Sequence, residues 1–464
     1  MLALSRSART LAEIRALLAL ATPIIIAQLA YTSMGFVDTV MAGRVSARDL
    51  AGVALGNSLW VPVFLLMNGT LLATTAKVAQ RFGAGKEAEN GPLVRQALWL
   101  ALAIGMLCAV LLWNAEPVLR LMGVDAELSA LAMGYLRGVA CGFPATALYQ
   151  VLRCFSDGLG RTRPSMVLGI CGLLLNIPLN YVLIYGKLGL PALGGVGCGW
   201  ATLVVNCGML AVALWLLRTQ AMYAPLQVWQ RMEPPNRAQL AAFARLGIPS
   251  ALAVTVEVTS FTLMALFIAR QGTLASAAHQ IAANMAAVLY MVPLSLAIAT
   301  SARVSYWRGA GQAAHAQQAV YIGFRLLALI CIALAAIVFI ANHWIASVYS
   351  NDAQVVMAAA GLLGWVALYH LADAVQTLCI FLLRCFRITL APLVVYGVML
   401  WGVGLGGGYL WAYHGFGPVA SLASPVPFWA ASAAALVVTA VVFAAMLRRA
   451  LLSSSASVPE EGAR

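Results

Sequence analysis

Three of the 15 acidic residues lie inside long apolar stretches: Asp38, Glu257 and Asp373. A charged side chain in the hydrocarbon of a membrane costs at least about 2.5 kcal/mol, and it usually marks a polar pathway for an ion or a substrate. A carboxyl group in that setting can exchange a proton or bind a metal cation. These three acids are therefore the first candidates for chemistry in this chain.

Two of the acids are predicted to lie at the same depth in the membrane. Glu257 is 12 residues beyond Arg245, which corresponds to about 18 Å of helix. Asp373 is 11 residues before Arg384, which corresponds to about 16 Å. Because both arginines are expected at cytoplasmic helix ends, both acids are expected near the midplane. Tyr369, four residues before Asp373, shares its helix face, where its hydroxyl can help to bind a cation.

A second group of polar residues is predicted in the first half of the chain. Asn176 and Asn180 lie one helical turn apart around Pro178. Together with Asp38 they form a second candidate polar site, in a helix that a proline can open. Asp38 itself is 23 residues, about 34 Å, beyond Arg15 and is expected near the outer surface. Structural hydrogen bonds between helices explain the two asparagines equally well.

The composition requires that membrane helices carry these residues. Charged residues make up 9% of the chain, hydrophobic residues 62%, and the mean hydropathy is +0.90. Soluble domains have about 25% charged residues, so a soluble globular protein is excluded. A net charge of +13 often indicates nucleic-acid binding, but here the basic residues lie in short gaps between apolar stretches. Orientation in a membrane explains them, and no nucleic-acid partner is expected.

The apolar stretches predict twelve transmembrane helices, since about 20 residues cross the hydrocarbon. Their expected limits are 16–37, 52–75, 93–113, 130–152, 164–186, 194–217, 243–268, 277–300, 319–340, 358–383, 391–412 and 427–447. With both termini in the cytoplasm, 21 Lys and Arg residues fall on the inner side and five on the outer side. The positive-inside rule therefore predicts that both termini are cytoplasmic.

The two halves of the chain are predicted to be copies of one another. A shift of 226 residues aligns Leu20 and Pro23 with Leu246 and Pro249, and Gly83-Ala84-Gly85 with Gly309-Ala310-Gly311. Six helices per half gives both copies the same orientation in the membrane, which is a transporter architecture. No candidate acid aligns with an acid in the other half, so the fold does not require the three carboxylates. The proline-rich connection from Arg218 to Arg245 predicts an N-terminal bundle over 1–235 and a C-terminal bundle over 236–464.

No enzyme is indicated by the remaining reactive residues. The nine cysteines show no CxxC spacing near histidines, and the five histidines form no paired-ligand pattern. The cysteines are well explained as small, buried, apolar side chains. An integral-membrane enzyme would need a metal or nucleophile constellation that this sequence does not contain.

Four motifs give the chain a family resemblance. They are Met34-Gly35-Phe36-Val37-Asp38-Thr39-Val40-Met41-Ala42-Gly43, Asp157-Gly158-Leu159-Gly160-Arg161-Thr162-Arg163-Pro164, Asn176-Ile177-Pro178-Leu179-Asn180-Tyr181 and Gly194-Gly195-Val196-Gly197-Cys198-Gly199. The sequence resembles the multidrug and toxic compound extrusion (MATE) transporters, of the bacterial NorM type, over essentially its whole length. One departure is the inner loop Arg384-Cys385-Phe386-Arg387-Ile388, where the family usually has a glycine-bearing, charged turn.

The resemblance implies an all-α fold of two six-helix bundles that alternate access. It implies a bacterial inner-membrane antiporter, active as a monomer among membrane lipids, that exports cationic or amphipathic drugs and dyes. H+ and/or Na+ would be the coupling ion, and no further cofactor is implied. The residues that match the family's cation and substrate site in the C-terminal bundle are Glu257, Tyr369 and Asp373, and Na+ is a candidate ligand there.

Further positions follow from the same resemblance. Those that match the polar site of the N-terminal bundle are Asp38, Asn176, Asn180 and Thr202. Substrate contacts, besides Glu257 and Asp373, are implied at Gln280, Tyr290 and Asp352.

Other membrane proteins fit the sequence less well. A lipid-linked oligosaccharide flippase of the same superfamily is the nearest alternative, but it would have an arginine-rich cavity, whereas the midplane charge here is acidic. A major-facilitator transporter would carry a glycine, an acid and a basic cluster in the connection from Lys77 to Arg95, and this connection lacks that pattern. A channel stays open as an alternative, and flux that ignores a cation gradient would identify one.

Overall fold

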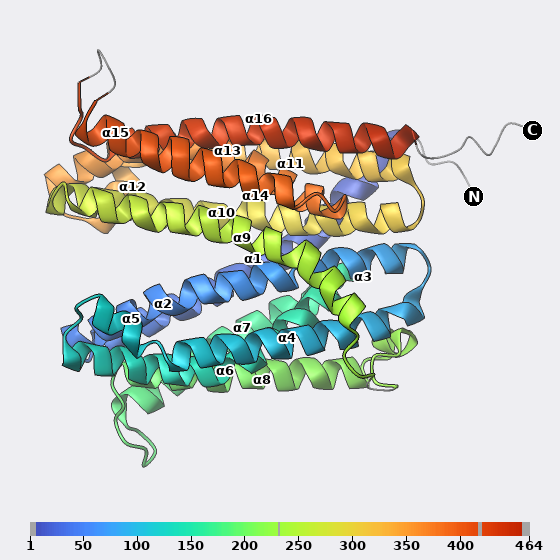
Figure 1. Cartoon of the computed structure of the whole chain (residues 1–464), viewed down its shortest axis with the longest axis horizontal. Helices are drawn as coiled ribbons and strands as arrows, with labels where there is room; N and C mark the ends of the chain where they lie inside the picture. Colours follow the sequence, from blue (N-terminus) through green and yellow to red (C-terminus); the bar gives the residue numbers. More distant parts are fainter. Residues whose placement is uncertain (1–5, 231–232, 416–419, 457–464) are drawn as a thin grey trace, which may run out of the picture. The chain divides into compact units, whose positions relative to one another are not determined.

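The computed structural model describes residues 6–230, 233–415 and 420–456, and these are almost entirely helical. The helices, labelled in Figure 1 where there is room, are α1 (Arg6–Gly43), α2 (Ala47–Leu71), α3 (Ala73–Gly83), α4 (Asn90–Trp113), α5 (Glu116–Leu121), α6 (Ala126–Gly158), α7 (Arg163–Tyr185), α8 (Val196–Thr219), α9 (Arg237–Ala269), α10 (Thr273–Gly309), α11 (Ala313–Ile340), α12 (Asn342–Tyr349), α13 (Ala353–Cys385), α14 (Leu390–Tyr396), α15 (Gly408–Tyr413) and α16 (Val426–Ala456). Two 3-10 turns are η1 (Glu87–Glu89) and η2 (Ala221–Leu226), and a π-helical segment is η3 (Gly397–Gly407).

The twelve predicted spans are confirmed by these helices. Eleven of the described helical segments are long and apolar enough to cross a membrane; α2 with α3 forms one of them, and α14, η3 and α15 form another. The twelfth is α6, which has the length but is less apolar because it carries Arg137 and Arg153. The chain is therefore a multi-pass membrane protein.

The eleventh span departs from a regular α-helix. Its centre, η3, is π-helical over 11 residues, and five of them are glycines. Glycine has no side chain to constrain the backbone, so it permits departures from α-helical geometry. π-helical turns are often found at functional sites. The carbonyl oxygen of Leu400 in η3 accepts a hydrogen bond from the Ser260 hydroxyl, and the Trp401 indole donates to the carbonyl oxygen of Val256. The segment thus packs directly against α9, beside Glu257.

The chain forms two compact units, one of residues 22–251 and one of residues 1–21 with 252–464. In the first unit, α6 packs against α2, α4 and α8; in the second, α13 packs against α10, α11 and α16 (Figure 1). The unit boundaries fall inside α1 and α9, two residues from Pro23 and Pro249. The division into bundles 1–235 and 236–464 stays a prediction.

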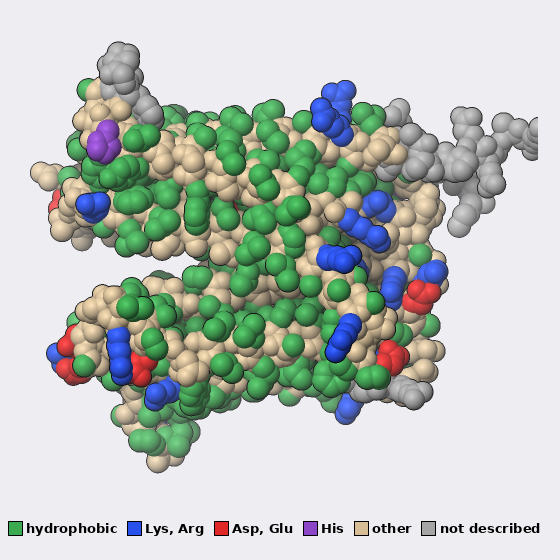
Figure 2. All heavy atoms as spheres, in the orientation of Figure 1, with side chains coloured by type: hydrophobic (Ala, Val, Ile, Leu, Met, Phe, Trp, Pro, Cys, Tyr) green, Lys and Arg blue, Asp and Glu red, His purple; other side chains and the backbone are tan. Residues whose placement is uncertain are grey.

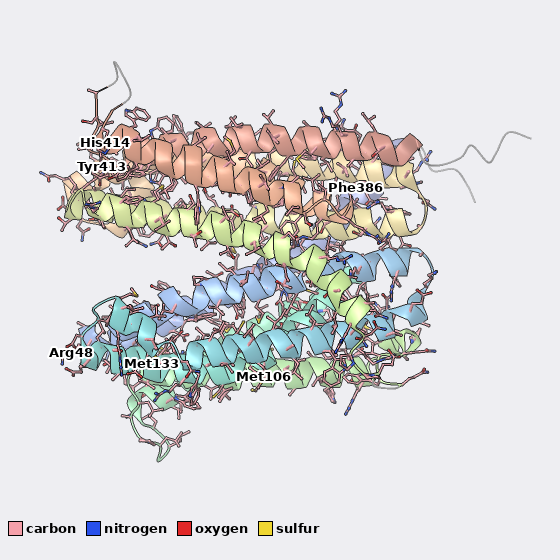
Figure 3. All side chains as sticks on the ribbon, viewed as in Figure 1. Arg48, Met106, Met133, Phe386, Tyr413 and His414 are labelled. Atoms are coloured by element: carbon pink, nitrogen blue, oxygen red, sulfur yellow. The ribbon has the colours of Figure 1, made fainter. Side chains whose placement is uncertain are left out.

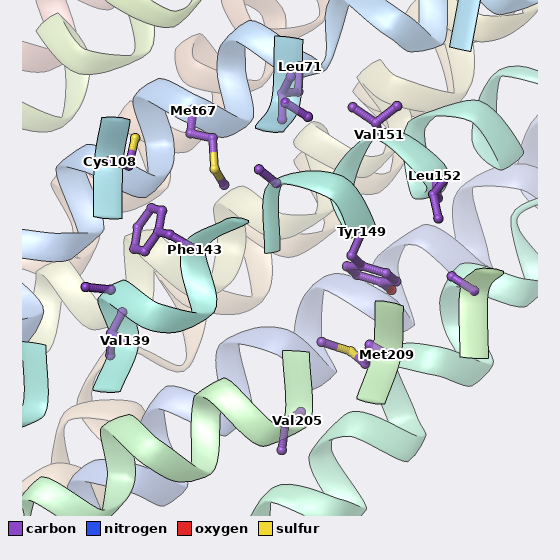
Figure 4. Close-up of a cluster of buried hydrophobic side chains, with 14 of the residues drawn as sticks. Met67, Leu71, Cys108, Val139, Phe143, Tyr149, Val151, Leu152, Val205 and Met209 are labelled. Atoms are coloured by element: carbon purple, nitrogen blue, oxygen red, sulfur yellow. The ribbon is translucent and has the colours of Figure 1, made fainter. Parts of the chain in front are cut away.

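Each unit has its own packed interior. In the unit of residues 22–251, side chains from α2, α4, α6 and α8 form one continuous apolar cluster (Figure 4). Met67, Phe143 and Val205 in this cluster are at most 2% exposed. Between α6 and α8 the backbones themselves touch. A Cβ atom on Gly138 would lie 2.6 Å from the carbonyl carbon of Gly199, and one on Gly199 would collide with the carbonyl oxygen of Tyr135. Small residues allow this close approach of membrane helices.

Equivalent contacts dock the first helix of each repeat. In one unit, Glu13 of α1 accepts two hydrogen bonds from Arg303 of α10, at 2.9 and 2.6 Å. Arg303 aligns with Lys77 under the shift of 226 residues, and in the other unit the Lys77 ammonium lies 3.7 Å above the ring of Phe243 in α9. The duplication therefore preserves the docking position while the chemistry of the contact differs.

The connection between the two halves is held against α4. Arg95, only 4% exposed, donates to the carbonyl oxygens of Gln227 and Val228 and pairs with Glu233 at 2.6 Å. Gln96 donates to the carbonyl oxygen of Pro234 at 2.9 Å. The proline-rich connection is thus a fixed strap in its described part, where the sequence predicts only a linker.

The surface has the distribution expected of membrane helices. On the face in Figure 2, hydrophobic side chains cover the middle of the helices, and charged side chains gather toward the helix ends. Arg48, for example, lies where α2 begins, and the exposed Met106 lies part-way along α4 (Figure 3). In the other unit, Phe386 lies at the C-terminal end of α13. Tyr413 and His414 lie at the C-terminal end of α15, toward the opposite end of the helices (Figure 3).

Candidate cation and substrate sites

The two acids predicted to lie near the midplane come together in the unit that contains residues 252–464. Glu257 of α9 is half-buried and Asp373 of α13 is 4% exposed. One buried amide nitrogen, that of Gln376, lies within hydrogen-bond distance of both carboxyl groups. Two carboxyl groups this close repel one another when both are ionised, so one of them readily holds a proton. The geometry therefore suits a pair that shares a proton.

Gln376, one turn after Asp373, bridges the two acids. Its side-chain amide donates to Asp373 Oδ1 at 2.8 Å and lies 3.3 Å from Glu257 Oε1. Its oxygen accepts a hydrogen bond from the Tyr396 hydroxyl. Since that oxygen is occupied, the amide nitrogen must face the acids. Gln376 is fully buried, and its hydrogen bond with Tyr396 of α14 holds this arrangement in place.

Aromatic rings form one wall beside the acids. Tyr369 contacts the rings of Phe261 and Trp429 with centroids 6.3 and 5.6 Å apart. The Trp429 indole also lies 3.3 Å from Nδ1 of His279, to which it donates. Ring faces attract organic cations, and buried rings make a shaped apolar surface. Tyr290 lies on α10, which packs against α13, the helix that carries Asp373.

Two of the expected substrate contacts are exposed and make hydrogen bonds to groups other than the acids. Gln280 is exposed and donates to Asn284 at 3.2 Å. Asp352 is exposed at the start of α13, where it accepts hydrogen bonds from the backbone of Gln354 and Val355 as an N-cap. It precedes Asp373 by 21 residues, about 31 Å of helix. Helix capping accounts for Asp352, and its role in substrate binding stays a prediction.

The second predicted polar group assembles in the unit of residues 22–251. Asp38 of α1 is 4% exposed and receives hydrogen bonds from Asn180 at 2.6 Å and Asn176 at 3.2 Å, both on α7. Thr202 of α8 donates to the other carboxylate oxygen at 3.4 Å. Because Asn176 and Asn180 are one turn apart, both amides reach the same acid.

This second group keeps one acceptor unused. Asn180 Oδ1 is buried, and within the described part of the chain it has no hydrogen-bond partner. It lies on the amide whose nitrogen already binds Asp38, so it is suited to accept a hydrogen bond from a protonated acid or to contact a cation. The group can thus serve as a proton or cation site as well as a link between α1, α7 and α8.

Sequence reasoning missed Gln376 and Tyr396. The spacing of three residues between Asp373 and Gln376 places both on one face of α13, which was the available signal for the glutamine. No signal in the sequence indicated Tyr396, because its contact with Gln376 depends on how the eleventh span packs against the tenth.

Gln376 gives a testable expectation at this site. Replacing it with leucine should lower transport by about tenfold to a hundredfold, since hydrogen bonds to charged or proton-sharing groups contribute about 1.5–3 kcal/mol. Tyr396→Phe should cause a smaller loss, because it removes only the group that orients the amide. The initial rate of drug transport in proteoliposomes measures both. Tyr413→Phe is the control, since that hydroxyl binds the backbone of Phe267 instead. Equal rates for Gln376→Leu and Tyr413→Phe would contradict the bridging role.

Comparison with known proteins decides the family. The MatE family model matches the chain twice, over residues 23–182 and 249–410. The chain belongs to the MATE family. The two matches begin 226 residues apart, so they also confirm the duplication and its displacement.

Individual MATE proteins are similar over nearly the whole chain. The multidrug resistance protein PmpM of Pseudomonas aeruginosa is 50% identical over 410 residues, 88% of this chain and 86% of that protein. The multidrug resistance protein MdtK of Yersinia pseudotuberculosis is 39% identical, covering 90% and 91%. The crystal structure of the eukaryotic MATE transporter AtDTX14 shares the fold with a TM-score of 0.83 at 20% identity, covering 96% and 98%. The chain therefore has the twelve-helix MATE fold of a membrane transporter.

Proposed function

We propose that this MATE protein is an antiporter that exports cationic or amphipathic drugs and dyes in exchange for an inward-moving cation. The observation that carries the proposal is the pair of acids Glu257 and Asp373, which Gln376 bridges beside aromatic rings. Charged groups at this depth are costly and mark transport pathways. The names of the relatives PmpM and MdtK, both multidrug resistance proteins, support drugs as the substrate class.

The mechanism follows from competition for one negative charge. In the inward-open state the ionised acids hold a drug cation, and the aromatic rings cover its apolar part. In the outward-open state a cation from outside neutralises the same carboxylates, and the drug leaves. Because each ligand lowers the affinity for the other, the gradient of one drives the movement of the other.

The contacts of the pair favour H+ over Na+ as the coupling ion. Two neighbouring carboxyl groups can share one proton, whereas a metal ion would need lone pairs directed at one point. The neighbouring Gln376 turns its amide nitrogen, a donor, toward the acids. Asp38, with Asn176 and Asn180, is a second candidate site for the coupling ion.

The positive-inside pattern supports cytoplasmic termini, in the inner membrane of a bacterium.

Efflux from proteoliposomes tests the proposal. The purified protein should move ethidium against its gradient when a pH gradient is imposed, and an imposed Na+ gradient alone should leave ethidium in place. Ethidium fluorescence follows the transport, and protein-free liposomes under the same gradients are the control. Transport driven by Na+ alone would reject H+ coupling, and ethidium flux independent of both gradients would indicate a channel.

A further inference from the structure

A polar pocket lies between the start of α1 and the first turns of α11, in the unit that contains residues 1–21 and 252–464. Its volume is about 490 Å³, within the range of ligand-binding pockets. The polar side chains that line it are Arg9, Thr10, Gln317, Gln318, Tyr321 and Arg325. None of these residues belongs to the candidate transport sites.

The walls of this pocket are fixed to one another. Gln318 donates to the hydroxyl of Thr10 at 3.3 Å, which joins α11 to α1. Deeper in the same contact, Leu17 packs against Ile322 and Leu326, and Leu17 is fully buried. The pocket is therefore part of the packed contact between α1 and α11.

The charge of the pocket suits an anion. Two of its lining residues are arginines and none is acidic. The one acid of residues 1–21 is Glu13, which is already paired with Arg303 through two hydrogen bonds. Arg325 makes no ion pair within the described part of the chain, and the residue is exposed. Guanidinium groups bind phosphate through two parallel hydrogen bonds.

The position of Arg325 points to a ligand at the membrane surface. The 28 residues of α11 make a helix about 42 Å long, and the hydrocarbon is about 30 Å thick. With Ile340 at the outer interface, Arg325 is 15 residues, about 22.5 Å, from that interface and so about 7.5 Å inside the inner edge of the hydrocarbon. Tyr321, Leu329 and Ile332, spaced as one helix face with Arg325, are 63%, 70% and 58% exposed. An arginine on a lipid-facing surface needs an anionic partner or must extend to the headgroups.

We propose that this pocket binds a phosphate group through Arg9 and Arg325, with Tyr321 at the membrane interface. The lipid-facing exposure of Arg325 favours the phosphodiester headgroup of an anionic phospholipid as its source, since basic pockets on the cytoplasmic side of membrane helices suit such headgroups. A free phosphate ion has the same chemistry and is distinguished by experiment. The site is separate from drug transport and does not depend on the proposed function.

Native mass spectrometry of the purified protein in neutral detergent tests this site, with phosphatidylglycerol as the probe and phosphatidylcholine as the comparison. The wild type should bind phosphatidylglycerol preferentially. Arg9→Gln and Arg325→Gln should each weaken that binding about fivefold, and the double variant about thirtyfold. Arg325→Lys, which keeps the charge but cannot make the two parallel hydrogen bonds, should bind more weakly than the wild type and more tightly than Arg325→Gln. The matched control is Arg449→Gln, which removes an exposed arginine of α16 outside the pocket.

The arms of the experiment separate the two sources of phosphate. Loss of phosphatidylglycerol in the double variant, with binding kept in Arg449→Gln, assigns the site to a lipid headgroup. Binding of inorganic phosphate that requires both arginines, without lipid preference, keeps the phosphate site and assigns it to the free ion. Equal phosphatidylglycerol binding and equal phosphate binding by the wild type, the double variant and the control would overturn the proposal. Size-exclusion profiles show that each variant is folded.

Discussion

Asp373→Asn and Glu257→Gln should each reduce gradient-driven ethidium efflux to the level of protein-free liposomes. Either substitution removes a carboxyl group that must be ionised to hold the drug cation and neutralised to release it. The remaining acid keeps its charge, but it loses the neighbouring carboxyl group with which it shares the Gln376 amide. An amide has nearly the same shape as a carboxyl group, so the helices should pack as before.

The measurement is the initial rate of ethidium efflux under an imposed pH gradient, with equal amounts of folded protein in each preparation. Asp373→Glu keeps a carboxyl group and should retain part of the rate. Glu127→Gln is the control, because its side chain is 60% exposed and pairs with Arg48 at the surface. Rates in both amide variants that match this control would mean that the midplane acids are structural, and the antiporter mechanism proposed above would be wrong.

The second large effect is expected on folding. Gly199→Val should abolish the yield of folded protein, because a Cβ atom at this position collides with the carbonyl oxygen of Tyr135 in the crossing of α6 and α8. Backbone atoms on both sides of the contact leave no flexible side chain that can move away. Overpacking of an interior typically costs about 1–3 kcal/mol, and a clash with the backbone costs more.

Gly208→Val is the matched control for this substitution. Gly208 lies on the same helix, yet a Cβ atom there meets only the end of the Leu175 side chain, at 3.9 Å. Fluorescence-detected size-exclusion chromatography compares the monodisperse peak of the two variants with that of the wild type. A normal peak for Gly199→Val would show that α6 and α8 can separate without loss of the fold, and the close crossing would lose its structural importance.

The sequence alone determined the spans and their repeat, and it predicts the depth of the acids. Apolar runs of about 20 residues can only be membrane helices, because water is absent there to satisfy an exposed backbone. The fixed rise of a helix then gives the depth of Glu257 and Asp373 relative to Arg245 and Arg384. The i, i+4 spacing of Asn176 and Asn180 likewise predicted that both face one way, and both bind Asp38.

Only the tertiary structure decided how these helices combine. The bridge by Gln376, its orientation by Tyr396, and the aromatic wall of Tyr369 and Trp429 all join helices far apart in the chain. The docking of Glu13 on Arg303 is of the same kind. Local patterns give the face and depth of each residue, whereas the partner across the contact depends on which helices pack together and at what angle. That choice is made by the packing of whole helices, which no single stretch of sequence encodes.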